Sequence, residues 1–254
     1  MSGDFVVAKG QVEQAGEAGV ELLPPQPVES LGPVVALLDG VDLRTAATVP
    51  TVLPTAHALV HEVGRLRAGE SVLVQGAAGG IGTAVGQMVR AAGAGAVYGV
   101  TSSKAKAEYA LAHGYDDVFL AEAFDQDVRR ATGGRGVDLV LDPVGGDTLR
   151  RGLDALAAFG RLVSFGNASG AEPWRAGQAD LAPRALSVSG FSVLALAATA
   201  PDALRELTAR ALRTVAEGTV SLPVTAEFPL QDAAEAHRLM GGRTSTGKLL
   251  LHVD

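Results

Sequence analysis

Three glycines, Gly76, Gly79 and Gly82, have the spacing G-x-x-G-x-x-G and directly follow the apolar run 71–75. Glycine is needed where a strand turns tightly into a helix, where a backbone approaches a pyrophosphate, and where the helix meets the strand. The helix expected over 81–92 would add free N–H groups and the positive end of its dipole. The pattern predicts a phosphate site for a dinucleotide, and the structural alternative is a glycine-rich turn that binds no nucleotide.

The second apolar run, 96–101, ends at Ser102, Ser103 and Lys106. A domain that binds NAD(H) usually carries an acidic residue at this point, which holds the 2′-hydroxyl of the ribose. This sequence has hydroxyl and ammonium groups there instead, and they suit a 2′-phosphate, which a carboxylate would repel. The pattern favours NADP(H) over NAD(H). The serines are also typical caps of the following helix, and the two roles are compatible.

Short apolar strands alternate with helices along most of the chain. We expect strands at 71–75, 96–101, 118–120, 138–142, 161–165 and 187–191, and helices at 81–92, 104–113, 123–132 and 148–157. This alternation predicts an α/β fold, a Rossmann-type doubly wound parallel sheet with helices on both faces. A helix in two pieces, broken by Pro50 and Pro54, should precede the sheet. After it we expect a helix over 201–217, a strand near Val224, a helix over 232–240 and a last strand over 248–253.

Five segments carry a resemblance to a known family. In chain order they are AGESVLVQGAAGGIGTAVGQMVRAAGA, VTSSKAKAEYALAHGYDDV, GGRGVDLVLDPVGGDTL, GRLVSFGNASG and TGKLLLHV. From about Gly32 to its end, the chain resembles the medium-chain dehydrogenase/reductase superfamily, in particular its zinc-independent branch of quinone oxidoreductases and enoyl reductases. The chain has no cysteine, which agrees with this branch because the zinc-dependent branch uses cysteine ligands.

The resemblance implies positions for the parts of an NADP(H) molecule, although it assigns no catalytic residue. The pyrophosphate would lie on the loop that contains Ala78, Gly79, Gly80 and Ile81, and the 2′-phosphate on Ser102 and Lys106. Asp142 and Val144 would lie along the adenosine. The nicotinamide ribose would approach Phe165, Gly166 and Asn167. The nicotinamide itself would lie near Phe191, Val193 and Thr55.

The N-terminal part departs from the family. Relatives carry a much longer β-rich substrate lobe before the segment that corresponds to DGVDLRTAATVP. We therefore expect a short N-terminal arm or remnant of that lobe at 1–40, a dinucleotide-binding domain at 41–220, and a C-terminal segment returning to a truncated second lobe at 221–254. Either the arm replaces the lobe, or a homodimer or other partner subunit completes the site, or the lobe has been removed.

Composition excludes several other classes of protein. The net charge of −7 disfavours nucleic-acid binding, and the lack of cysteine excludes disulfides and thiolate zinc sites. No apolar run is long enough for a bilayer and no secretory signal is present, so we expect a cytoplasmic protein without membrane contact.

His57 and His61 lie one helical turn apart, but no third ligand is evident, so no metal site is expected. They are interpreted as part of a polar helix face, with His57 as an alternative proton donor near the nicotinamide.

Two functions remain open at this point. The resemblance implies an NADP(H)-dependent reductase that transfers hydride to a small-molecule substrate, namely a conjugated enone, a quinone or an enoyl thioester. In such an enzyme the cofactor carries the chemistry, so a nucleophilic triad is not required. The alternative is an NADP(H)-binding protein without redox turnover, or a non-redox enzyme on a degenerate reductase scaffold, since a fold does not fix a function.

Overall fold

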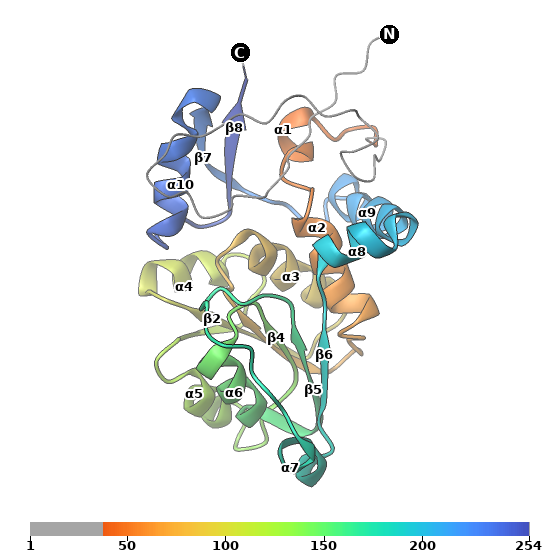
Figure 1. Ribbon diagram of the computed structural model, residues 1–254, viewed down its shortest axis with the longest axis vertical. Coiled ribbons are helices and arrows are strands. Elements are labelled where there is room, and N and C mark those ends of the chain that lie inside the picture. The colour runs from red at the N-terminus through yellow and green to blue at the C-terminus, as the bar shows by residue number, and fades with distance from the viewer. Residues whose placement is uncertain (1–37, 254) are drawn as a thin grey trace.

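A six-stranded, fully parallel sheet forms the centre of the chain in the computed structural model, which describes residues 38–253 (Figure 1). The strands are β1 Ser71–Gln75, β2 Ala96–Thr101, β3 Asp117–Leu120, β4 Val137–Asp142, β5 Leu156–Ser164 and β6 Ser187–Gly190. Their order across the sheet is β3-β2-β1-β4-β5-β6. This is the order of a doubly wound dinucleotide-binding fold, so the predicted fold class is confirmed.

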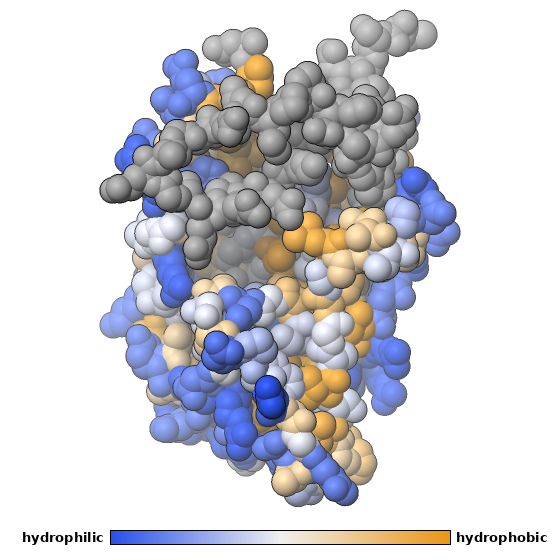
Figure 2. Space-filling model, in the orientation of Figure 1, coloured by the Kyte–Doolittle hydropathy of each residue, from blue (hydrophilic) through white to orange (hydrophobic). Residues whose placement is uncertain are grey.

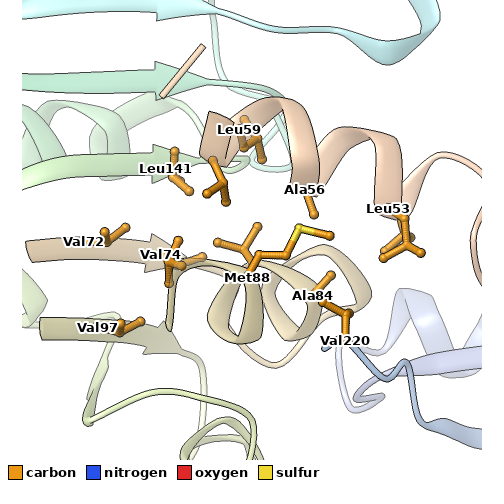
Figure 3. Packing of buried hydrophobic residues seen from close by; sticks show 14 of the residues in the cluster. Leu53, Ala56, Leu59, Val72, Val74, Ala84, Met88, Val97, Leu141 and Val220 are labelled. Carbon is orange, nitrogen blue, oxygen red and sulfur yellow. The ribbon is translucent and has the colours of Figure 1, made fainter. Parts of the chain in front are cut away.

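Helices cover both faces of the sheet, as the continuous apolar strands predict. They are α3 Gly80–Ala91, α4 Lys104–Leu111, α5 Phe124–Ala131 and α6 Gly146–Asp154. Along β1, Val72 and Val74 pack in the same cluster as α3, whereas Leu73 packs in the cluster that contains residues of α5 and α6. In Figure 3, Met88 of α3 lies between the β1 side chains and α2. Alternate residues of one strand therefore anchor opposite layers.

The predicted helix 148–157 is too long, because α6 ends at Asp154 and β5 begins at Leu156. The backbone explains the early start of the strand. Val137 donates its N–H to Ala155 O at 3.0 Å, and Val137 pairs with Leu156 before the register shifts. Pairing with β4 therefore competes successfully with continuation of the helix.

Two short helices and a π-helical turn precede the sheet. They are α1 Leu43–Ala46, α2 Val52–His57 and the turn Ala58–Glu62. A break falls beside Pro50, as predicted, but the predicted break at Pro54 is wrong. Pro54 lies in the first turn of α2, where a missing N–H removes no intrahelical hydrogen bond.

After β6 the chain continues through α8 Val193–Thr199, α9 Pro201–Ala216, β7 Val224–Pro229, α10 Ala233–Gly241 and β8 Lys248–His252. Helix α7 Gln178–Leu181 precedes β6 and lies at the opposite end of the sheet from β7 and β8 (Figure 1). Strands β7 and β8 pair in parallel as a separate two-stranded sheet, and Figure 1 shows them with α10 beyond α3 and α4. The expected arm 1–40 lies almost wholly outside the described residues. No helix within 38–253 has the length and apolar character needed to cross a membrane.

His57 and His61 lie against α9 with their ring centroids 4.6 Å apart. His57 is 9% exposed, and its Nδ1 has no hydrogen-bond partner among the described residues. Burial, together with the positive charges of His61 and Arg210, lowers the pKa of His57 to about 4. Within 38–253 no group of three or more potential ligands could hold a metal ion.

Acid should therefore destabilise the fold through His57. The unfolded chain takes up a proton on this residue near pH 6.5, whereas the folded chain does so only near pH 4. The free energy of unfolding should fall by about 1–3 kcal/mol over that interval, and His57→Gln should remove much of this fall. Urea unfolding at a series of pH values measures it. His237→Gln, at an exposed position of α10, is the control, and an unchanged acid limb in His57→Gln would contradict the prediction.

Candidate dinucleotide site

The C-terminal ends of β1, β2, β4 and β5 meet at one edge of the sheet, beside the point where the strand order reverses between β1 and β4. Ligands of doubly wound folds bind at this position. The loops that follow these four strands contain most of the residues that the sequence predicts for cofactor binding. The topology therefore gathers the phosphate loop, the β2 end and the β4 and β5 turns on one side of the sheet.

The glycine loop between β1 and α3 is a tight turn with two different uses of glycine. Gly76 has φ +70°, and Gly79 donates its N–H to Gly76 O at 3.0 Å. A Cβ on Gly82 would lie 2.3 Å from Gly76 O, so glycine at this position allows the helix to pack closely on the end of the strand. A Cβ on Gly79 would meet only Gly76 O, at 3.4 Å. The protein thus leaves space at Gly79, beside the unpaired N–H groups at the start of α3.

Lys248 reaches this loop from β8, and sequence reasoning missed it. Gly247 donates its N–H to Ala78 O at 3.0 Å, which brings β8 to the start of α3. The Cδ of Lys248 lies 2.9 Å from the position that a Cβ on Gly80 would take. Burial lowers the pKa of the Lys248 ammonium, and no acidic side chain within 38–253 pairs with it. A desolvated cation beside the positive end of a helix is the arrangement that an anion stabilises.

The end of β2 combines helix capping with positive charge. Ser103 caps α4 by accepting the Lys106 N–H, so the capping interpretation is correct, while Ser102 is exposed beside it. The Lys106 ammonium donates to Arg243 O at 2.6 Å. Burial, and then the charge of Arg243, lowers the pKa of Lys106. Arg243 is a second cation that the sequence analysis did not identify, since only the fold brings the loop before β8 to α4.

Asp142, at the end of β4, is fully buried and holds the turn that follows. Its Oδ1 accepts the N–H groups of Val144 at 2.6 Å and Gly145 at 3.1 Å. Its backbone O accepts the Phe165 N–H at 2.9 Å, which joins the β4 and β5 ends. The Asp142 carboxylate therefore faces its own turn, and it shapes the adenosine side through Val144 rather than by presenting a surface charge.

The turn after β5 lies against the turn after β4. A Cβ on Gly166 would lie 2.7 Å from Pro143 O, so glycine permits the contact. The Asn167 amide is engaged in its own loop, since Nδ2 donates to Ala171 O at 2.8 Å and Oδ1 accepts from Ser169 Oγ at 3.0 Å. Only a rearrangement of these two bonds would free the Asn167 side chain for a ribose.

The residues expected near the nicotinamide lie around α2 and α8. Phe191 donates its N–H to Ser164 O at 2.9 Å, and both Phe191 and Val193 pack against one apolar cluster, formed by Ala58, Leu204 and Leu207. Thr55 is 3% exposed, and its Oγ1 has no partner among the described residues. Apolar surface extends over α8, where Leu194 is 59% exposed (Figure 2). His57 lies against α9 and is neutral near pH 7, which does not favour it as a proton donor.

A groove of about 790 Å³ lies elsewhere, between β3 and α5. Asp117, Glu122 and Asp127 line it, with Arg130 as its one cation. A surface with this excess of carboxylates repels phosphate, so the groove does not compete with the loop after β1 as a nucleotide site.

Comparison with known proteins agrees with this geometry. A family model described as zinc-binding dehydrogenase matches residues 80–209. Phthioceranic/hydroxyphthioceranic acid synthase of Mycobacterium tuberculosis is 35% identical over 233 residues, which cover 84% of this chain and 10% of the synthase. The chain thus spans about a tenth of the mycobacterial synthases that it matches.

Two shorter relatives are matched over more of their length. The 2-haloacrylate reductase of a Burkholderia species is 34% identical over 248 residues, covering 93% of this chain and 74% of the reductase. The crystal structure of Escherichia coli quinone oxidoreductase complexed with NADPH superposes with a TM-score of 0.76 at 30% identity, covering 85% of this chain and 67% of that chain. The chain belongs to the zinc-binding dehydrogenase family, within the medium-chain dehydrogenase/reductase superfamily that its motifs indicated.

Proposed function

We propose that this protein is an NADP(H)-dependent reductase that transfers hydride to a conjugated enone, a quinone or an enoyl thioester. The observation that carries the proposal is the desolvated ammonium of Lys248 beside the start of α3, with which no acidic side chain within 38–253 pairs. A pyrophosphate supplies the missing negative charge and accepts the free N–H groups of the helix. The open space at Gly79 leaves the backbone accessible to it.

Lys106 and Arg243 account for the preference for a 2′-phosphate. The Lys106 ammonium donates to the backbone O of Arg243, and the positive charge of Arg243 helps to lower the pKa of Lys106. Two cations are thus close enough to interact at the end of β2, where the segment 101–106 carries no carboxylate. Two neighbouring cations repel each other, and a dianion between them relieves that repulsion. NADH carries only a hydroxyl at this position, so it gains little from either side chain.

The cofactor, when bound, supplies the hydride. The phosphate loop and Lys248 would hold its pyrophosphate, and the Ser102 and Lys106 side chains would hold its 2′-phosphate. The turn after β4 would lie along its adenosine, and the turn after β5 would approach its nicotinamide ribose. At the nicotinamide end of the site, the buried Thr55 hydroxyl has no hydrogen-bond partner among the described residues. No nucleophile is needed, because the protein has only to orient the cofactor and the substrate and to exclude water.

The names of the relatives support the substrate class. One relative is named as a reductase of 2-haloacrylate, which contains an activated double bond, and another is named as a quinone oxidoreductase. These two names support an activated double bond or a quinone as the group that this protein reduces. We propose a cytoplasmic protein that requires no zinc, with residues 41–220 as the dinucleotide-binding domain and 221–254 as part of the substrate lobe. A homodimer or a partner subunit completes the nicotinamide side.

A second candidate is an NADP(H)-binding protein without redox turnover, or a non-redox enzyme on the same scaffold. It stays a candidate because the dinucleotide-binding fold by itself does not fix a function. Two measurements separate the candidates. NADPH binding is titrated by fluorescence, and NADPH oxidation is followed by absorbance with a panel of quinones, enones and enoyl thioesters. Turnover with any class establishes the reductase, whereas tight binding with no turnover across the panel supports the second candidate.

Gly79→Val should abolish dinucleotide binding while the fold survives. The backbone at Gly79 is extended, with φ −79° and ψ 170°, which valine tolerates, but the branched side chain occupies the space for the pyrophosphate. Thermal unfolding and NADPH titration measure the two effects. Gly177→Val is the matched control, since Gly177 also begins a helix in extended conformation. Parental NADPH affinity in a folded Gly79→Val protein would show that the loop is only a turn.

Lys106→Ala should weaken NADPH by about 1–3 kcal/mol, the range for hydrogen bonds to charged groups, and should leave NADH nearly unchanged. The dissociation constants of both cofactors measure this selectivity. Lys104→Ala, an exposed cation at the start of the same helix, controls for general charge loss. Equal losses for the two cofactors would overturn the assignment of Lys106 to the 2′-phosphate.

Lys248→Met should weaken NADPH and NADH alike, each by about tenfold, because both carry the pyrophosphate. The same substitution should leave the melting temperature unchanged or raise it, since methionine keeps the stem and removes an unpaired, desolvated charge. Calorimetry in the absence of cofactor and titration with each dinucleotide measure the pair of effects. A loss confined to NADPH would place Lys248 at the 2′-phosphate instead.

A further inference from the structure

Two buried oxygen atoms beneath the dinucleotide site have no hydrogen-bond donor among residues 38–253. They are Oε1 of Gln75, whose residue is 1% exposed, and Oδ2 of Asp142, whose residue is fully buried. Buried polar atoms are nearly always satisfied, so two such acceptors at the same strand ends require a common explanation. The cofactor-binding scheme above uses neither atom.

The two side chains are neighbours on one face of the sheet. β1 and β4 pair in register through Val74 and Leu141, and Gln75 and Asp142 are the next residues of the two strands. Val74 and Leu141 pack in the cluster on the α3 face, so their successors face the α6 side. The Gln75 amide confirms this direction, since its Nε2 donates to Thr148 O of α6 at 3.3 Å.

The orientation of the Gln75 amide follows from that contact. Exchanging its oxygen and nitrogen would place Oε1 against Thr148 O, and two acceptors would then face each other at 3.3 Å. The Gln75 oxygen therefore points away from α6. On the other side chain, Oδ1 of Asp142 already accepts two backbone N–H groups, which leaves Oδ2 as the free atom. Both free atoms are acceptors, so they can satisfy each other only if the carboxyl group of Asp142 carries a proton.

We propose that Asp142 is a neutral carboxylic acid in the folded protein, protonated on Oδ2 and donating that proton to Gln75 Oε1. It is a positioning residue, which holds the turn of Val144 and Gly145 without placing a negative charge under the phosphates of the dinucleotide. This inference concerns the apo protein and does not depend on the proposed activity.

The surroundings favour the neutral form. Burial raises the pKa of Asp142, and only the Val144 and Gly145 N–H groups oppose the rise. Among the elements that the structure describes, no charged side chain compensates an ionised Asp142. On α6, Arg150 pairs with Asp180, Arg151 pairs with Asp125, and Asp147 is exposed. On β5, Arg161 pairs with Glu70, and β1 contributes only the neutral Gln75 to this face.

Infrared spectroscopy of the apo protein tests the protonation state directly. At pH 7 the parent should show the carbonyl stretch of a buried protonated carboxyl group, and Asp142→Asn should lack it. Asp138→Asn, at the opposite end of β4, is the matched control, because Asp138 pairs with Arg135 and its loss should leave the band in place. Gln75→Met should keep the band and move it to higher wavenumber, since the proton loses its acceptor. Absence of the band in the parent, or its persistence in Asp142→Asn, overturns the proposal.

The pH dependence of stability gives an independent readout. A folded acid with a raised pKa contributes most at low pH, and its contribution is lost as pH rises from the unfolded value near 3.8 toward the folded one. Asp142→Asn, which is nearly isosteric and cannot ionise, should therefore have a higher melting temperature than the parent at pH 7, and the difference should vanish toward pH 4. Asp138→Asn should lower the melting temperature at pH 7. A lower melting temperature for Asp142→Asn at pH 7 shows an ionised Asp142 and overturns the proposal.

The infrared and melting measurements are made on the apo protein, so they are independent of cofactor binding. If the parent binds no NADPH, the proposed function fails, while the infrared band and the pH profile still decide the state of Asp142.

Discussion

The contact between the start of α3 and the end of β1 is the constraint on which the site depends. A Cβ on Gly82 would lie 2.3 Å from Gly76 O, so the helix and the strand end are in close contact here. The Tyr115 hydroxyl donates to Gly82 O at 2.6 Å and holds the same residue. This contact fixes the helix axis relative to the strand. Because α3 is held there, its free N–H groups open toward the strand ends, where a phosphate can reach them.

A second consequence concerns the C-terminal segment, which completes the anion site from a distant part of the chain. The hydrogen bond from Gly247 to Ala78 O brings Lys248 to the same helix end, and Lys106 contacts the backbone of Arg243. No acidic side chain within 38–253 pairs with Lys248 or Lys106. Without a ligand, the positive charges at this helix end therefore raise the free energy of the folded protein. Binding of an anion there would remove this unfavourable contribution, and the affinity for the anion would be higher for that reason.

The sequence predicts regular elements well where local and long-range preferences agree. The ranges 71–75 and 96–101 coincide with β1 and β2, because both are apolar runs bounded by turn residues. It fails where strand pairing decides, as at Leu156, which belongs to β5 because β4 lies beside it. The glycine loop was visible from spacing alone. Lys248 and Arg243 were not, since their proximity to the loop and to Lys106 exists only after the chain has folded.

Asp142 shows a different kind of limit. By resemblance it was assigned to the adenosine side, yet burial and partners decide what a carboxyl group can do, and neither is visible in a motif. The charged groups near this site differ in how deeply they are buried. Lys106 and Arg243 lie near the surface at the end of β2, whereas Asp142 is fully buried and no cationic side chain within 38–253 pairs with it. An ionised carboxylate there would be buried without compensation and would oppose the ligand that its own turn helps to hold, so a neutral acid satisfies the demands of both the fold and the site.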